Sequence, residues 1–99
     1  MIITSQKNEN VLVLGIEGRL DTITSVDLEE KLDCELEGVE TLIFDLEKLE
    51  YISSAGLRVL LATTKEIERN DGHMIVRNVS NDVMDIFEVT GFVEILNIE

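Results

Sequence analysis

The sequence predicts an α/β domain in which a mixed, mainly parallel β-sheet of about five strands packs with about three helices. Short apolar runs alternate with amphipathic stretches along the whole chain, which is the pattern of βαβ units. Each amphipathic stretch is long enough for the crossover helix that two parallel strands require. With 99 residues and 44% hydrophobic composition, the chain has room for one domain, residues 1–99, and one core.

The first two predicted strands are close enough in sequence to form a hairpin. Ile2–Ser5 is a short apolar run, and the polar residues Lys7–Asn10 are typical of a turn. Val11–Ile16 is a continuous apolar strand, as expected where both faces of a parallel sheet are covered. Gly18 is predicted to end this strand. The first strand is therefore expected to lie antiparallel at the edge of the sheet.

The first helix is predicted from a loose capping box. Thr24 stands at the N-cap position and Asp27 three residues later. The leucines that follow are spaced by four residues and share one face: Leu28, Leu32 and Leu36. Gly38 is a natural stop for this helix.

The third strand and the second helix follow directly. Thr41–Leu46 is the strand, and the helix is expected to begin at Ser53 or Ser54. Its apolar face is formed by residues at helical spacing, namely Leu57, Leu60, Leu61, Thr64 and Ile67. Asp71 and Gly72 are expected to end it in a turn.

The last third of the chain repeats the pattern. Met74–Val76 begins the fourth strand, and Ser80 or Asn81 is predicted to cap a third helix that ends at Gly91. Val93–Ile98 is predicted to be a last strand. The predicted order is β-β-α-β-α-β-α-β, with right-handed crossovers between the parallel strands.

Charge and cysteine content limit the classes of partner. The formal net charge of −13, from 21 acidic and 8 basic residues, argues against nucleic acid and against an anionic membrane surface. A basic protein surface would be attracted, although the charge is equally consistent with solubility alone. Cys34 has no second cysteine for a disulfide and is expected to act as a small hydrophobic residue. With no signal-peptide pattern and no apolar run long enough to cross a bilayer, a cytoplasmic protein is expected.

No catalytic or metal-binding pattern stands out. The single histidine, His73, begins a strand, whereas Ser53 and Ser54 lie at the opposite end of the preceding helix, roughly 20–25 Å away. A nucleophilic serine without a nearby base is not activated. The sequence has no nucleophile elbow and no glycine-rich phosphate loop, and one Cys and one His without ligand-spaced partners do not predict a metal site. We therefore expect no enzyme, no catalytic residue, no metal and no cofactor.

One segment does suggest a function. Residues 49–61, LEYISSAGLRVLL, run from a strand and loop through two serines into the amphipathic second helix. In one interpretation the serines only cap the helix, and Ala-Gly lets its first turn pack closely. In the other, a serine at the exposed helix start is a site for phosphorylation, because the added charge of about −1.5 to −2 meets the positive end of the helix dipole. Such a modification would change the surface without disturbing the fold.

The motif SSAGLRVLL resembles the phosphorylation segment of STAS-domain anti-sigma factor antagonists, in which the pattern is D-S-[ST]-G-L. Aligned on Gly56 and Leu57, the resemblance places Ser54 at the phospho-acceptor position and Ser53 where an Asp is common. Arg58 stands where a small Gly is frequent and adds a positive charge beside the site.

Further matches follow in register along nearly the whole chain. They are Glu17–Asp21 for the family's G-x-L-D turn, Thr41–Leu46 for its third strand and Val89–Phe92 for its T-G-[LF] step. The resemblance implies a STAS-domain fold. Family members usually carry a further helix after the last strand, and because this chain stops at Glu99 we expect one face of the sheet to be less covered.

The resemblance also implies a mechanism and its partners. The unphosphorylated antagonist would bind an anti-sigma factor that is also an ATP-dependent serine kinase, which frees the sigma factor. Phosphorylation of Ser54 would dissociate the complex, and a serine phosphatase would restore it. The residues implied in partner binding are Asp21, Thr22, Ser53, Gly56, Leu57 and Arg58. Asp21 alternatively serves only to terminate a turn, as Asp often does.

Two other functions remain open at this point. A STAS domain that is never phosphorylated would act as a scaffold or as a transport-accessory subunit. A two-component receiver would accept phosphate on Asp45, but it needs an acidic pair after the first parallel strand and a late lysine, and residues 70–99 contain no lysine.

Overall fold

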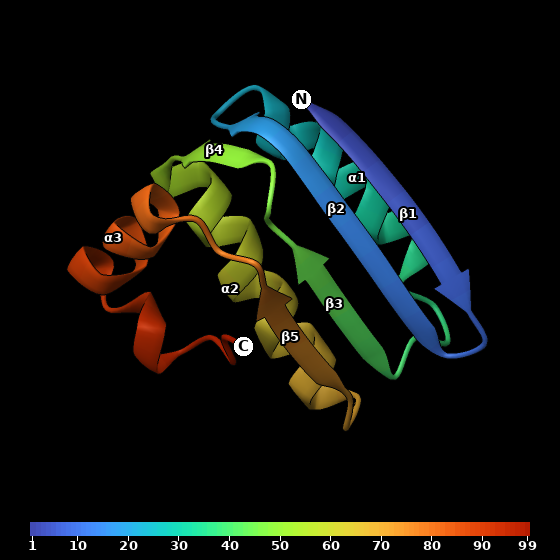
Figure 1. Ribbon diagram of the computed structural model, residues 1–99. Coiled ribbons are helices and arrows are strands. Elements are labelled where there is room, and N and C mark those ends of the chain that lie inside the picture. The colour runs from blue at the N-terminus through green and yellow to red at the C-terminus, as the bar shows by residue number, and fades with distance from the viewer.

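A computed structural model describes residues 1–99 as one mixed sheet with helices on one side and at one end (Figure 1). The elements in chain order are β1 (Ile2–Asn8), β2 (Val11–Leu20), α1 (Thr24–Glu35), β3 (Thr41–Asp45), β4 (Leu49–Ile52), α2 (Ser54–Arg69), β5 (His73–Arg77), α3 (Asn81–Thr90) and a short 3₁₀ helix, η1 (Phe92–Glu94). The predicted fold class, with three helices and a five-stranded mixed sheet, is confirmed.

The long strand β2 organises the sheet. It pairs antiparallel with β1, as the hairpin prediction required, and its first half pairs in parallel with β3. Its second half pairs in parallel with β4, after a register shift between Gly18 and Arg19. Gly18 adopts a φ of 100°, which only glycine reaches readily, so the strand is distorted there. The prediction that Gly18 ends the strand is therefore wrong, because the strand continues to Leu20.

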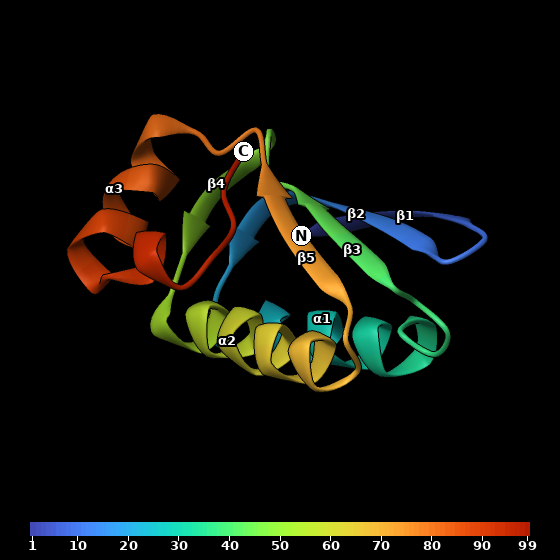
Figure 2. The same ribbon diagram turned by 90° about the horizontal axis from the view of Figure 1, so that it is seen from below.

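The two longest helices cover one face of the sheet (Figure 2). Along β2, fully buried residues alternate with half-buried ones, and the buried set points to the helices: Leu12, Leu14 and Ile16. α3 packs instead against β4 at one end of the sheet, where Val83 and Phe87 are completely buried. This arrangement leaves the other face of the central strands without a helix.

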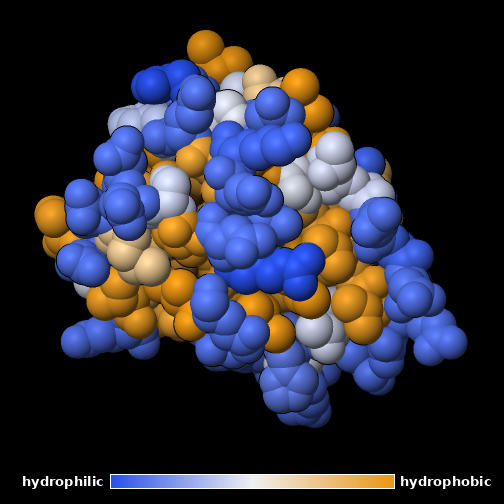
Figure 3. Space-filling model, in the orientation of Figure 1, coloured by the Kyte–Doolittle hydropathy of each residue, from blue (hydrophilic) through white to orange (hydrophobic).

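That second face is a mixed surface (Figure 3). The aliphatic residues Val13, Ile43 and Ile75 lie side by side on β2, β3 and β5 and are half-buried. Beside them, Asp45 and Arg77 form an ion pair at the carboxyl ends of β3 and β5.

The predicted order of strands is wrong at two places. Val93–Ile98 is not a strand, because Gly91 ends α3 in the left-handed conformation and the chain then turns back through η1. Its contact with the sheet is an isolated bridge between Val76 and Ile98. The fifth strand is β4, whose four residues are too few to show a strand period in the sequence.

Candidate functional site

The predicted site residues come from two separate segments that meet at one end of the sheet. β2 and β4 are parallel neighbours, so the turn after Leu20 and the start of α2 emerge side by side. The backbone N–H of Ser53 donates a hydrogen bond of 2.9 Å to the carbonyl of Leu20, which ties the two segments together. Asp21 and Thr22 therefore lie next to Ser53 and Ser54, as Figures 1 and 2 show for their elements.

Asp21 has a defined structural role in this turn. Its carboxylate accepts hydrogen bonds from the backbone N–H groups of Ile23 and Thr24, both at 3.0 Å, and from the Thr24 hydroxyl at 3.1 Å. Asp21 thus binds the free N–H groups at the start of α1. Thr24 is the first residue of that helix and not the N-cap that the sequence had predicted. The backbone N–H of Thr24, followed by its hydroxyl, holds the pKa of Asp21 below the ordinary value of 3.8, and Arg19 acts in the same direction.

Asp21→Asn is expected to destabilise the domain at neutral pH, with a loss that shrinks as the pH falls below 3.8. In that range the unfolded chain takes up a proton at Asp21 before the folded protein does. The wild type therefore loses the stability that the Asp21 carboxylate contributes, whereas the variant lacks this carboxylate at every pH. Urea unfolding at pH 7 and pH 3 measures the effect. Asp27→Asn is the matched control, because it removes one negative charge from the first turn of α1 and leaves the hydrogen bonds of Asp21 in place. An equal, pH-independent effect of both substitutions would show that the Asp21 turn carries no special stability.

Ser53 and Ser54 have different environments although they are adjacent. Ser53 is the N-cap of α2, and its hydroxyl accepts a hydrogen bond of 3.3 Å from the backbone N–H of Gly56. Ser54 is the first residue of the helix, is exposed, and its hydroxyl makes no hydrogen bond within the protein. The capping interpretation therefore applies to Ser53. Ser54 presents the free hydroxyl that the phosphorylation interpretation requires.

The next residues of α2 differ sharply in exposure. Gly56 is buried, and a Cβ there would lie 2.8 Å from side-chain atoms of both Leu20 and Ile52. Leu57 is 7% exposed and belongs to the core, whereas Arg58 is exposed. Gly56 and Leu57 can therefore influence a partner only by positioning the start of the helix, and Arg58 can reach one directly.

The structure also reveals apolar groups that the sequence reasoning missed. Ile23 is 80% exposed and Val26 is 52% exposed, and both lie at the start of α1 beside the Asp21 turn. They fall outside the four-residue spacing of Leu28 and Leu32, the buried leucines of that helix. This departure from the apolar period was the signal in the sequence that could have identified them. An exposed aliphatic pair beside the Asp21 turn suits a protein-binding surface.

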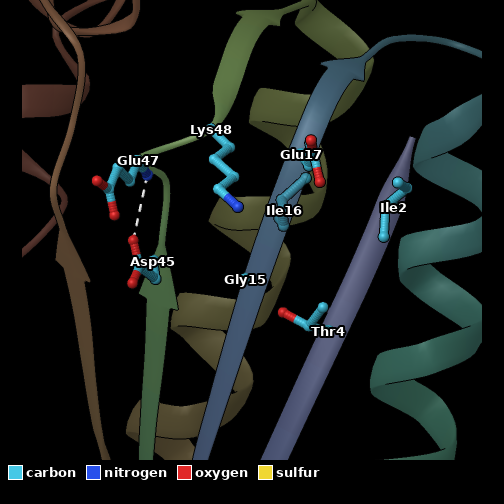
Figure 4. Close-up of a pocket in the computed structure, with 8 residues that line it drawn as sticks. All are labelled: Ile2, Thr4, Gly15, Ile16, Glu17, Asp45, Glu47 and Lys48. Carbon is cyan, nitrogen blue, oxygen red and sulfur yellow. Dashed lines mark hydrogen bonds between the residues drawn. The ribbon is translucent and has the colours of Figure 1, made fainter.

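One hollow lies away from these residues, on the open face of the sheet (Figure 4). It has a volume of about 250 Å³, and the Lys48 side chain points toward β2 beside Ile16. Gly15 also lines it, and a Cβ at this position would lie 2.6 Å from the Thr4 hydroxyl oxygen. The volume of this hollow is below the range of about 300–1,000 Å³ typical of small-molecule sites. No three His, Cys, Asp or Glu side chains are placed to hold a metal ion, and no helix is long and apolar enough to span a membrane.

A family model described as the STAS domain matches residues 3–99. The chain belongs to the STAS domain family. This STAS domain is 31% identical over 96 residues to BtrV of Bordetella bronchiseptica, covering 96% of this chain and 83% of that protein. It is 30% identical over 93 residues to the anti-sigma-B factor antagonist of Bacillus subtilis, covering 94% and 85% of the two chains.

Solved structures agree with the fold of this STAS domain. The anti-sigma factor antagonist SpoIIAA in its unphosphorylated form superposes with a TM-score of 0.78 at 20% identity, over 99% of this chain and 87% of the other. An anti-sigma factor antagonist from Mycobacterium paratuberculosis gives a TM-score of 0.83 at 21% identity, over 98% and 83%. At these identities the likeness establishes the fold of the domain.

Proposed function

We propose that this STAS domain is an anti-sigma factor antagonist whose binding is switched by phosphorylation of Ser54. The observation that carries the proposal is the exposed, unpartnered hydroxyl of Ser54 at the first residue of α2, beside the Asp21 turn. Support comes from the relative in Bacillus subtilis that is named an anti-sigma-B factor antagonist and is 30% identical. In its unphosphorylated state the domain binds an anti-sigma factor serine kinase, and the sigma factor is released.

The chemistry is a phosphoryl transfer in which this domain is the substrate rather than the enzyme. The Ser54 oxygen bonds to the γ-phosphorus of ATP held by the kinase, the bond from that phosphorus to the β–γ bridging oxygen breaks, ADP leaves and the hydroxyl proton is lost to solvent. Because the Ser54 hydroxyl makes no internal hydrogen bond, the transfer breaks no native contact. A serine phosphatase reverses it by hydrolysis of the phosphoserine.

The local structure tolerates the added phosphate. The first N–H groups of a helix lack partners within the helix, and the dipole there favours negative charge. Phosphorylation therefore adds a charge of about −1.5 to −2 to the surface while α2 stays folded. The switch acts on docking, since the new charge lies at the same end of the sheet as the turn that carries Thr22 and the exposed Ile23. Such a regulator works in the cytoplasm, where its kinase and ATP are present.

Incubation with ATP and the anti-sigma kinase encoded in the same genome is expected to add one phosphate, located on Ser54 by mass spectrometry of peptides. Ser54→Ala is expected to remain unmodified. Ser53→Ala is the matched control, because it removes the neighbouring hydroxyl and should still be phosphorylated. If the wild type stayed unmodified, or if the phosphate were found on Ser53, a scaffold or transport-accessory role without phosphorylation would be favoured.

A further inference from the structure

Arg58 is an unpaired cation placed one turn beyond Ser54. The protein forms two ion pairs, Lys31–Glu35 and Arg77–Asp45, and Arg58 takes part in neither. The other cations of α2, Lys65 and Arg69, lie in its second half. In a chain with 21 acidic and 8 basic residues, an exposed guanidinium without a carboxylate partner is free to take a new one.

The spacing directs Arg58 toward Ser54. Residues four apart on a helix are neighbours, with about 5–6 Å between their Cβ atoms. Helical side chains lean toward the N-terminus, so a long side chain covers the turn before its own Cα. An acidic group four residues N-terminal to a basic one is also the more favourable orientation of such a pair. A phosphate on Ser54 therefore falls within the natural reach of the Arg58 guanidinium.

The first turn of α2 supplies further donors. The Gly56 N–H is bonded to the Ser53 hydroxyl, and the Leu57 N–H is bonded to the Ser53 carbonyl. The N–H groups of Ser54 and Ala55 precede these and have no backbone acceptor. A phosphate attached to Ser54 can accept from these donors while a second oxygen faces the guanidinium.

Nearby carboxylates are weaker competitors for Arg58. Glu29 and Asp33 on α1, and Glu66 on α2, line a groove with Arg58, and Asp21 lies in the adjoining turn. None of them forms an ion pair with Arg58. A phosphate carries about −1.5 to −2 charge and several acceptor oxygens, so it attracts the planar guanidinium more strongly than one carboxylate does.

We propose that Arg58 binds the phosphate of phosphorylated Ser54 within the same helix, as an intramolecular clamp. The inference rests on the proposed phosphorylation of Ser54. The clamp holds the phosphate against the first two turns of α2 and at the same time withdraws the Arg58 charge from the docking surface. Phosphorylation then changes two features that a partner meets, because it adds an anionic group and neutralises a cation.

The test uses protein with phosphoserine inserted at position 54 during translation, which makes it independent of any kinase. The pH titration of the phosphoserine ³¹P resonance is compared between wild type and Arg58→Gln. A nearby cation favours the dianion, so the wild-type midpoint is expected about half a pH unit lower than in the variant. Phosphorylation is also expected to raise the melting temperature more in the wild type than in Arg58→Gln.

Arg69→Gln is the matched control, since it removes the same charge from the same helix about 22 Å along its axis from Ser54. It is expected to leave the ³¹P midpoint unchanged. Equal midpoints in wild type and Arg58→Gln, or an equal displacement in Arg69→Gln, would overturn the clamp. A kinase that fails to modify Ser54 would overturn the proposed function instead. The ³¹P titration would still test the clamp, because the phosphoserine is inserted during translation.

Discussion

Ser54→Ala is expected to bind the anti-sigma kinase persistently in the presence of ATP, whereas the phosphorylated wild type is expected to bind it about a hundredfold more weakly or worse. The alanine variant keeps the surface of the unmodified domain, because the Ser54 hydroxyl makes no internal hydrogen bond. Ser54→Asp carries part of the phosphate charge and is expected to weaken binding about tenfold or more. Isothermal titration against the kinase measures all three affinities.

The expected size follows from the position of the new charge. A charge that is buried without a partner, or a charge-assisted hydrogen bond that is lost, costs a few kcal/mol at an interface. Since about 1.4 kcal/mol corresponds to a factor of ten, two such effects weaken binding at least about a hundredfold. The background net charge of −13 adds to this only within roughly 8–10 Å at physiological salt, because more distant charges are screened.

α3 offers a matched control for the aspartate variant. Asn81 is the first residue of that helix and follows the N-cap Ser80, just as Ser54 follows Ser53. Asn81→Asp thus adds one negative charge at the same helical position but away from the Asp21 turn, and its affinity should match the wild type. Equal affinities of Ser54→Ala and Ser54→Asp would remove the switch model, and an equal loss in Asn81→Asp would reduce it to a general charge effect.

Gly56→Ala is expected to lower the free energy of unfolding by about 1–3 kcal/mol, even though alanine is the better helix former. The added Cβ would lie 2.8 Å from Ile52 Cγ1 and 2.8 Å from Leu20 Cγ, and both side chains are almost fully buried. The backbone of Gly56 has no positive φ, so the requirement for glycine is one of space. For a domain of this size the change corresponds to a fall of at least about 4 °C in the melting temperature.

A double-mutant cycle with Leu20→Ala isolates the cause. Leu20→Ala alone is expected to cost about 2–5 kcal/mol through the cavity that it leaves. In the Gly56→Ala background the same change also relieves the close contact, so the combined loss should be smaller than the sum. Strict additivity of the two losses would show that the contact between Leu20 and residue 56 does not limit the packing of α2 on the sheet.

Local signals in the sequence predicted most helix ends correctly. Ser53 and Ser80 cap α2 and α3, and Gly91 ends α3, because capping depends on hydrogen bonds within a few residues. Thr24 was placed one residue out, since the Asp21 carboxylate binds the backbone N–H and the hydroxyl of Thr24, which is itself the first residue of α1. Cys34, expected as a small hydrophobic residue, is exposed.

Errors arose where a segment is defined by its neighbours in space. β4 is a strand because it pairs with the second half of β2, about thirty residues away in the chain. Val93–Ile98 is apolar enough for a strand, yet the left-handed Gly91 directs the chain into η1 instead. Leu96 is buried although it belongs to no strand. Neither pairing partner nor chain direction is recorded in the local pattern of apolar residues.

The same division applies to the candidate site. The sequence by itself determined that a serine hydroxyl stands at the first residue of a helix, because caps and helical period act over one or two turns. The tertiary structure decided that Asp21 lies beside Ser53, that Leu57 is buried and that Ser54 and Arg58 face solvent. These outcomes depend on how β2 and β4 pair and how α2 packs on them, and contacts between distant segments settle both.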